Sequence, residues 1–188
     1  MPLLRSFAAF VLVSAFAGVL AAEPPAPASP APAVPPAARP AEATENRVVT
    51  TEPVHAIVLP MTGSYEQHPA AFERVAGYLA GKGVAPAGAP FARYLSDPSA
   101  GEAQLQWEVG FPVATEATAE APFEVRDLPP SLSAVHVHRA PYDELVAAWP
   151  AFVQWILASG YQPAGPPMQV FNGDFATPDV EMRMPVRK

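Results

Sequence analysis

The chain has 188 residues, half of them hydrophobic, which suffices for one ordinary domain but hardly for two. Its charge is acidic, with 11 Lys and Arg against 18 Asp and Glu, so the chain lacks the basic surface that direct nucleic-acid binding requires. There is no cysteine, which excludes disulfide bonds, thiolate metal sites and a cysteine nucleophile.

The first 22 residues have the layout of a secretory signal peptide. A positive charge at Arg5 precedes an apolar run over residues 7–20, and the small residues Ala21 and Ala22 offer a cleavage site. The apolar run is shorter than the ~20 residues that a membrane-spanning helix normally needs, so cleavage is favoured over retention as an anchor. We therefore expect a periplasmic or secreted protein with no stable membrane span after cleavage.

Residues 23–47 are expected to form a Pro/Ala-rich linker. Of residues 23–44, 8 are Pro and 8 are Ala. Proline fixes one backbone angle and removes a hydrogen-bond donor, so this stretch predicts an extended, semi-rigid spacer. The spacer could hold the domain away from a surface or contact a protein partner, and a dispensable disordered tail is the alternative.

The folded domain is expected over residues 48–188 and begins with one or two strands rich in β-branched residues, up to Met61. A helix is predicted over about residues 69–80, with Pro69 at its first position and Gly81 and Gly83 as stop signals. Residues 91–95 then read as a short strand. Apolar and polar residues alternate over 103–113, which predicts a strand with two different faces.

The second half repeats this order of elements. Strands are predicted at residues 123–128 and 134–139, and the following helix carries an apolar stripe from Leu145 to Ile156. Pro150 either interrupts that helix or starts its main segment. Residues 168–171 and 180–186 read as the last two strands. Each half is thus interpreted as a strand-helix-strand-strand unit. With two strands counted before each helix, the chain predicts an α+β domain with about eight antiparallel strands and two helices.

One stretch occurs twice in the chain. Residues 83–90 and 160–167 agree at five positions, 77 residues apart, and aromatic residues on both sides agree at the same offset. The strand around Glu108 resembles the strand around Glu181 at an offset of 73. We interpret these matches as an internal duplication with a pseudo-two-fold axis, for which the alternative is chance similarity of two Pro/Gly turns. Glu108 and Glu181 are then counterparts.

The order and spacing of several segments carry a resemblance to a known family. The segments are residues 139–145, the turn at 160–167, Tyr94 with Asp97 and Pro98, and the strands at 107–113 and 181–186. Together they resemble the GyrI-like small-molecule-binding domain, which is the effector-binding domain of multidrug-responsive transcription regulators. The resemblance covers about residues 50–187 and implies a duplicated fold whose halves frame a ligand groove. The export signal in place of a DNA-binding segment leads us to expect a stand-alone exported member.

The resemblance also implies where a ligand would bind. In the regulators an acidic residue on the last strand lies among aromatic side chains and receives lipophilic cations, and Glu181 matches that position. A partly desolvated carboxylate and ring faces both attract a cation. The alternative for Glu181 is a solvent-facing carboxylate paired with Arg183. The further candidates for ligand contact, each with a packing role as its alternative, are Glu108, Tyr65, Tyr94, Trp107, Tyr142 and Phe171.

We therefore expect the domain to bind a small hydrophobic, possibly cationic molecule in an aromatic groove that contains an acidic residue. The alternative is a hydrolase of strained or electrophilic molecules with Glu181 as its catalytic residue, because some family members look like hydrolases of cyclopropane-containing compounds. If Glu108 and Glu181 lie close together, like-charge repulsion would raise one pKa and create an acid/base pair.

No cofactor or metal is expected. No phosphate loop, dinucleotide fingerprint or Ser/His/Asp signature appears in the sequence. His136 and His138 point to the same side of a predicted strand, but a third ligand at a suggestive spacing is not evident, so a polar strand face is the default interpretation.

Overall fold

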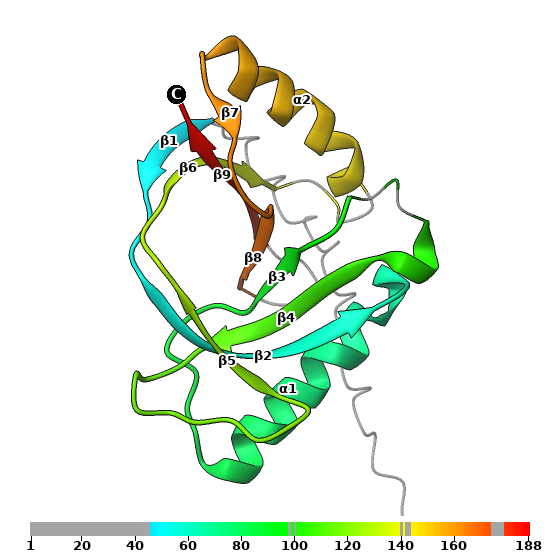
Figure 1. Ribbon diagram of the computed structural model, residues 1–188, viewed down its shortest axis with the longest axis vertical. Helices are drawn as coiled ribbons and strands as arrows, with labels where there is room; N and C mark the ends of the chain where they lie inside the picture. Colours follow the sequence, from blue (N-terminus) through cyan, green and yellow to red (C-terminus); the bar gives the residue numbers. More distant parts are fainter. Residues whose placement is uncertain (1–45, 98, 100, 140, 142–143, 174–178) are drawn as a thin grey trace, which may run out of the picture. The chain divides into compact units, whose positions relative to one another are not determined.

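The computed structural model of the protein describes residues 46–97, 99, 101–139, 141, 144–173 and 179–188 (Figure 1). The expected signal peptide, all but two residues of the expected linker and the candidate ligand residue Tyr142 lie outside the described residues. The boundaries expected at residues 22 and 47 therefore stay predictions.

The described residues form two helices and nine strands, which confirms the predicted α+β fold. Each half contains two strands, a helix and two further strands, and the second half adds the short β7. The elements of the first half are β1 (Arg47–Thr50), β2 (Val54–Thr62), α1 (His68–Lys82), β3 (Phe91–Tyr94) and β4 (Gln106–Pro112). Those of the second half are β5 (Glu124–Leu128), β6 (Leu132–His138), α2 (Leu145–Ala158), β7 (Gln162–Pro163), β8 (Met168–Asn172) and β9 (Asp179–Arg187).

All pairings in the sheet are antiparallel, and the strand order is symmetric. It runs β1-β6-β9-β8-β3-β4-β2-β5, with β7 added beside β9. The same order results when every strand is exchanged for its counterpart in the other half, so the pseudo-two-fold axis passes between β3 and β8. Each outermost strand pairs with the other half, β1 with β6 and β5 with β2. The sheet curls strongly along this order (Figure 1).

The hydrogen-bond register agrees with the sequence offsets of 77 and 73. Phe91 lies opposite Val170, and Arg93 lies opposite Met168. Met168 and Val170 follow Phe91 and Arg93 by 77 positions, so a two-fold rotation about the axis maps each of these two pairs onto the other. Phe91 also faces Gly110 on β4, just as Met168 faces Arg183 on β9. The same register makes Glu108 and Glu181 structural counterparts. That the halves arose from one duplicated unit stays a prediction.

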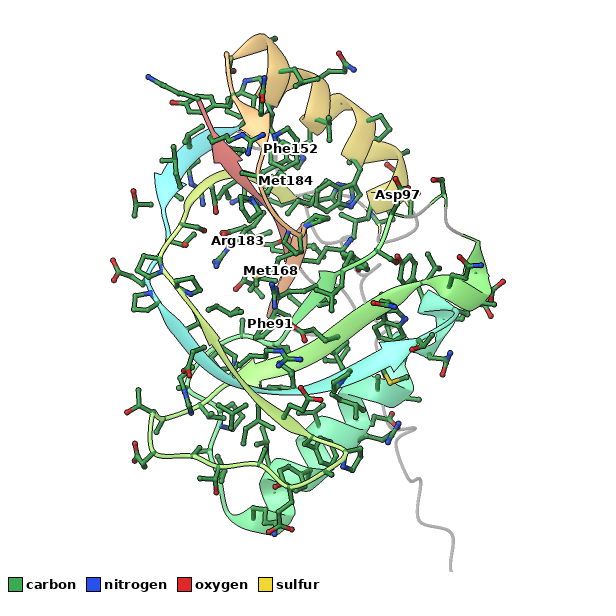
Figure 2. The ribbon with its side chains drawn as sticks, in the orientation of Figure 1. Phe91, Asp97, Phe152, Met168, Arg183 and Met184 are labelled. Carbon is green, nitrogen blue, oxygen red and sulfur yellow. The ribbon has the colours of Figure 1, made fainter. Side chains whose placement is uncertain are left out.

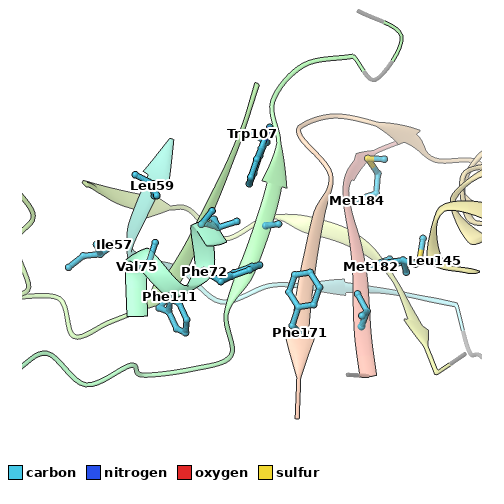
Figure 3. Packing of buried hydrophobic residues seen from close by; sticks show 14 of the residues in the cluster. Ile57, Leu59, Phe72, Val75, Trp107, Phe111, Leu145, Phe171, Met182 and Met184 are labelled. Carbon is cyan, nitrogen blue, oxygen red and sulfur yellow. The ribbon is translucent and has the colours of Figure 1, made fainter. Parts of the chain in front are cut away.

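Helix α1 begins and ends where its sequence signals indicate. Pro69 lies in the first turn, where a backbone N–H has no acceptor within the helix, so proline costs no helical hydrogen bond there. Gly83 ends the helix in the left-handed conformation, with φ of 67°. The apolar residues Phe72, Val75 and Leu79 recur on one side and are buried against the sheet. Figure 3 shows Phe72 and Val75 in this layer.

Helix α2 is continuous through Pro150, which lies inside it rather than at its start. The ring of Pro150 is exposed on the solvent side, while Leu145, Phe152 and Ile156 are buried. The helix contains no charged residue. Packing of its apolar face therefore compensates for the backbone hydrogen bond that proline removes.

The two helices pack on the same face of the sheet, here called the helix face. Side chains of alternate strand residues reach this face and form the main core, including Trp107, Phe111, Phe171, Met182 and Met184 (Figure 3). The remaining strand residues reach the opposite side, here called the cavity face, where Ala56, Val58, Phe91 and Val170 form a smaller buried cluster.

Candidate functional site

The candidate ligand residues divide between the two faces of the sheet. The aromatic candidates Tyr94, Trp107 and Phe171 lie on the helix face. The acidic candidates Glu108 and Glu181 reach the cavity face, because each lies between two helix-face residues on its strand. The structure therefore brings the aromatic candidates together but does not place either carboxylate among them.

Four rings form a compact group on the helix face, here called the aromatic cluster: Tyr65, His68, Tyr94 and Trp107. The His68 ring stacks on Tyr65 with centroids 5.6 Å apart and meets Trp107 edge to face at 4.4 Å. Tyr94 lies edge-on to both Tyr65 and His68, at 5.1 and 5.8 Å. Trp107 is fully buried, and its indole Nε1 donates to the carbonyl oxygen of Gly63 at 2.9 Å. Phe171 lies beyond the cluster, against Phe72.

His68 is the functional candidate that the sequence analysis missed. It is the first residue of α1 and only 8% exposed, and its Nε2 atom has no hydrogen-bond partner among the described residues. Burial lowers the pKa of His68 from 6.5 to about 4, so the imidazole is neutral at pH 7. The sequence offered only the neighbouring helix start as a signal, and it could not show that the ring is enclosed.

Gln169 is a second buried polar residue beside this cluster. It lies on β8 opposite Ala92, at the pseudo-two-fold axis, and it is 5% exposed. The hydroxyl of Tyr94 donates to its Oε1 at 2.7 Å. This hydrogen bond fixes the Tyr94 phenol, which comes from the other half of the domain. The sequence around Gln169 reads as an ordinary apolar strand, so nothing there singled it out.

Glu108 is completely buried on the cavity face and carries two guanidinium partners. Arg93 Nη1 donates to its Oε1, and Arg126 Nε donates to its Oε2 at 3.1 Å. Arg126 also pairs with Glu124 at 2.7 Å, and this set of charged partners raises the pKa of the Arg126 guanidinium although burial alone lowers it. A buried carboxylate of this kind is stable only when it is paired, which is how the structure holds it.

Glu181 has its own two arginines. Arg183 Nε donates to its Oε1, and Arg47 Nη2 from β1 donates to its Oε2 at 3.3 Å. The pairing with Arg183 is the alternative that the sequence left open. Strands β3 and β8 separate β9 from β4, so Glu181 and Glu108 are three strand spacings apart, on the order of 14 Å along the sheet. The structure does not bring the two carboxylates together as an acid/base pair, and the ligand role of each stays a prediction.

A cavity of about 680 Å³ lies on the cavity face. Its floor is formed by side chains of β3, β8 and β9, among them Phe91, Arg93, Met168, Val170 and Arg183. Figure 2 shows Phe91, Met168 and Arg183 along the space that the curled sheet encloses. The repeated turns line its wall through Gly88 and Gly165, so the duplicated sequence stretch contributes to a cavity as well as connecting a helix to a strand.

The two histidines of β6 serve other contacts. His136 Nδ1 lies 2.7 Å from Asn46 Oδ1, and His138 Nε2 lies 3.2 Å from the carbonyl oxygen of Pro141. Within the described part of the chain there is no group of three His, Asp, Glu or Cys side chains that could hold a metal ion. That part also contains no helix long and apolar enough to cross a membrane.

Comparisons with known proteins agree with this fold. A family model described as the GyrI-like small molecule binding domain matches residues 44–187. The structure is similar to the EcmrR C-terminal domain, with a TM-score of 0.69 and 16% identity over 78% of this chain and 99% of that chain. It is similar to a hydrolase from Listeria innocua, with a TM-score of 0.56 and 12% identity over 77% and 92% of the two chains. It is similar to SAV2435 bound to tetraphenylphosphonium, with a TM-score of 0.53 and 12% identity over 76% and 95%. No curated protein sequence matches the chain.

Proposed function

Because the chain belongs to the GyrI-like family of small-molecule-binding domains, we propose that it binds a hydrophobic amine at the aromatic cluster on the helix face of its sheet. The observation that carries this proposal is the Nε2 atom of His68, which is buried among Tyr65, Tyr94 and Trp107 without a hydrogen-bond partner among the described residues. An unpaired buried polar atom costs about 1–3 kcal/mol, so a ligand that supplies the missing partner regains part of that free energy.

The chemistry of the cluster selects the ligand class. With its proton on Nδ1, the neutral His68 imidazole accepts a hydrogen bond at Nε2 from an amine or ammonium N–H. The faces of the surrounding rings attract positive charge, and their edges and carbon atoms favour a flat apolar body. A hydrophobic amine satisfies both requirements, whereas a strongly hydrated ion satisfies neither.

The similarity to a structure that holds tetraphenylphosphonium supports a lipophilic cation as the ligand class. In the present proposal the polar contact is His68 rather than the Glu181 carboxylate, because Glu181 reaches the opposite face and is paired with Arg47 and Arg183. Hydrolysis is not proposed, because the candidate carboxylates Glu108 and Glu181 are three strand spacings apart and each is paired with two arginines.

Calorimetric titration with a matched pair of compounds tests the proposal. 1-Naphthylmethylamine should bind, and 1-methylnaphthalene, which has the same ring system without the amine, should bind about tenfold more weakly. His68→Phe keeps a ring in place but removes Nε2, so it should reduce this preference for the amine to near unity. His55→Phe, which removes an imidazole that takes no part in the aromatic cluster, is the control and should leave the preference intact. Equal affinity for the two compounds in the unaltered protein would refute the proposal.

We also propose that binding takes place outside the cytoplasm, because residues 1–22 have the layout of a cleaved signal peptide. Cell fractionation followed by mass measurement of the purified protein tests this location. The expected product is a periplasmic or secreted chain that begins near Glu23. Recovery of the uncleaved chain from the cytoplasm alone would contradict it.

A further inference from the structure

The cavity face carries a partly open cavity that the proposed amine site does not use. Its volume of about 680 Å³ lies within the range typical of small-molecule sites. The sheet itself separates it from the aromatic cluster, because Arg93 and Met168 face the cavity while their strand neighbours Tyr94 and Gln169 face the helices. A ligand in this cavity therefore touches no residue of the aromatic cluster.

The floor of the cavity is apolar. Phe91 and Val170 lie opposite each other on β3 and β8, and they belong to the buried cluster of this face. Met168 is packed against the same cluster and reaches the cavity beside them. The floor thus offers a flat surface for an aromatic or aliphatic body.

Two guanidinium groups flank this apolar floor. Arg93, Met168 and Arg183 form one cross-strand row over β3, β8 and β9, so the arginines stand on either side of the methionine. Each guanidinium donates a hydrogen bond to a carboxylate: Arg93 Nη1 donates to Glu108, and Arg183 Nε donates to Glu181. A guanidinium has five N–H donors, and these contacts use one from each arginine.

The charge that lines the cavity floor is therefore positive. Arg93 and Arg183 line the cavity, whereas Glu108 and Glu181 are absent from its lining. Among the described residues that line the cavity, Glu52 is the one acidic side chain, and it lies in the connection between β1 and β2. These two carboxylates preorganise the guanidiniums and are not among the residues that line the cavity.

From this arrangement we propose that the cavity is a second binding site, which takes an anionic amphiphile such as an aryl sulfonate or carboxylate. The anionic group lies between the remaining N–H donors of Arg93 and Arg183, and the apolar body covers Phe91 and Val170. This site is independent of the amine site in position and opposite to it in charge preference.

A pair of fluorescent probes with the same ring system tests the site in the full domain. 1-Anilinonaphthalene-8-sulfonate carries the anion, and N-phenyl-1-naphthylamine lacks it. Because each contains an aryl N–H, both are titrated with the aromatic cluster saturated by 1-naphthylmethylamine. The sulfonate should bind at one saturable site, about tenfold more tightly than the neutral probe, because charge-assisted hydrogen bonds to arginine are strong. Its affinity should fall as salt rises to about 0.5 M, since salt screens the partly exposed guanidiniums. Equal affinity for the two probes, or binding that salt does not change, would overturn the proposal.

Substitutions locate the probe within the cavity. Arg183→Gln removes one guanidinium while Arg47 continues to pair with Glu181, so the sulfonate should bind about tenfold more weakly and the neutral probe should be unaffected. Met168→Trp keeps both arginines but fills the floor, and it should weaken both probes. Lys82→Gln makes the same charge change on the exposed surface, where Lys82 pairs with Glu120, and should change neither.

Competition distinguishes the cavity from the amine site. Saturating 1-naphthylmethylamine should leave the sulfonate bound, because the two sites lie on opposite faces. Displacement of the sulfonate would place it in the aromatic cluster and refute the second site. A near-ultraviolet circular dichroism spectrum of each variant verifies that its core remains packed, so a loss of binding cannot be assigned to unfolding.

Discussion

The Tyr94 hydroxyl of β3 donates to Gln169 Oε1 of β8 at 2.7 Å, and this hydrogen bond links the two halves of the domain beside the pseudo-two-fold axis. This hydrogen bond has no equivalent at the symmetry-related position, because the counterpart of Gln169 in the first half is Ala92, whose side chain has no polar group. The halves therefore share their backbone register but differ in chemistry at the axis. The same asymmetry distinguishes the rest of the site, where the unpaired His68 corresponds to Leu145.

Tyr94→Phe tests whether this bond stabilises the domain. The substitution removes the donor and leaves the buried amide oxygen of Gln169 without it, so the free energy of unfolding should fall by about 1–2 kcal/mol. Urea denaturation measures the change. Tyr161→Phe, at a half-buried ring near Lys188, is the matched control and should change stability by less than about 0.5 kcal/mol. A Tyr94→Phe protein as stable as the unaltered domain would show that the bond contributes nothing net.

His68 makes a pH-dependent contribution to stability. Its pKa is about 4 in the folded state, against 6.5 for an ordinary histidine, so the unfolded chain binds the proton more tightly. The folded state therefore loses stability as the pH falls from about 6.5 to 4. The full loss below pH 4 is on the order of 3 kcal/mol.

Urea denaturation of the unaltered domain and of His68→Phe at several pH values measures this contribution. The substituted protein has no imidazole to protonate, so its stability should fall less steeply between pH 6.5 and 4. It should also be more stable than the unaltered domain below pH 5. The same pH dependence in both proteins would mean that another group causes the acid destabilisation.

His55 should act in the opposite direction. Its Nδ1 lies 2.6 Å from Asp127 Oδ1 and its Nε2 lies 3.2 Å from the carbonyl oxygen of Ala117, so the protonated ring finds an acceptor for each N–H. The hydrogen bond to Asp127 is the largest cause of a raised pKa, followed by the one to Ala117. The stabilisation is complete below pH 6.5 and disappears as the pH rises through the folded-state pKa.

Asp127→Asn should remove most of this contribution. The free energy of unfolding should fall at pH 5.5 by less than about 1 kcal/mol, because Asp127 is exposed to solvent, and it should change little at pH 8.5. Nuclear magnetic resonance titration of the His55 ring should show a lower pKa in the variant. Replacement of Glu116, which is also exposed, by Gln is the control, because Glu116 contributes least to the shift in pKa. An unchanged His55 pKa in Asp127→Asn would contradict the assignment.

Much of the fold could be predicted from local signals in the sequence. Pro69 and Gly83 delimit α1 within two residues, and the offset of 77 between the repeated turns reproduces the register of β3 against β8. The pairing of β1 with β6 could not be predicted in the same way. It joins residues more than 80 positions apart, and no local pattern in Val48 or Val49 specifies a partner in the other half.

The candidate site was harder to predict, because it depends on which face of the sheet each side chain reaches. Trp107 and Glu108 are consecutive residues on one strand, so their side chains reach opposite faces of the sheet and cannot line the same groove. The alternation of side chains along a strand is sufficient to predict this separation. The role of His68, in contrast, could not be predicted from strand alternation. Its ring is enclosed by residues from the turn before α1, from β3 and from β4, so only the assembled structure shows that Nε2 is unpaired.

Glu108 and Glu181 should differ in how much they contribute to stability, although they are counterparts in the register. Glu108 is completely buried and pairs with Arg93 and Arg126, so Glu108→Gln leaves Arg93 without its charge partner and Arg126 with Glu124 alone. The free energy of unfolding should fall by about 3–5 kcal/mol, as for other buried ion pairs that lose one member. Glu181 is 15% exposed, and its partner Arg47 is 45% exposed, so Glu181→Gln should cost about 1 kcal/mol.

Urea denaturation of the two variants side by side measures this difference, with each serving as the control for the other. The thermal shift caused by 1-naphthylmethylamine should be the same in Glu181→Gln as in the unaltered domain, because the carboxylate and the aromatic cluster lie on opposite faces. A shift that disappears in Glu181→Gln would instead support the ligand role that its place on the last strand predicts. Equal destabilisation by the two substitutions would mean that water reaches Glu108 as readily as it reaches Glu181.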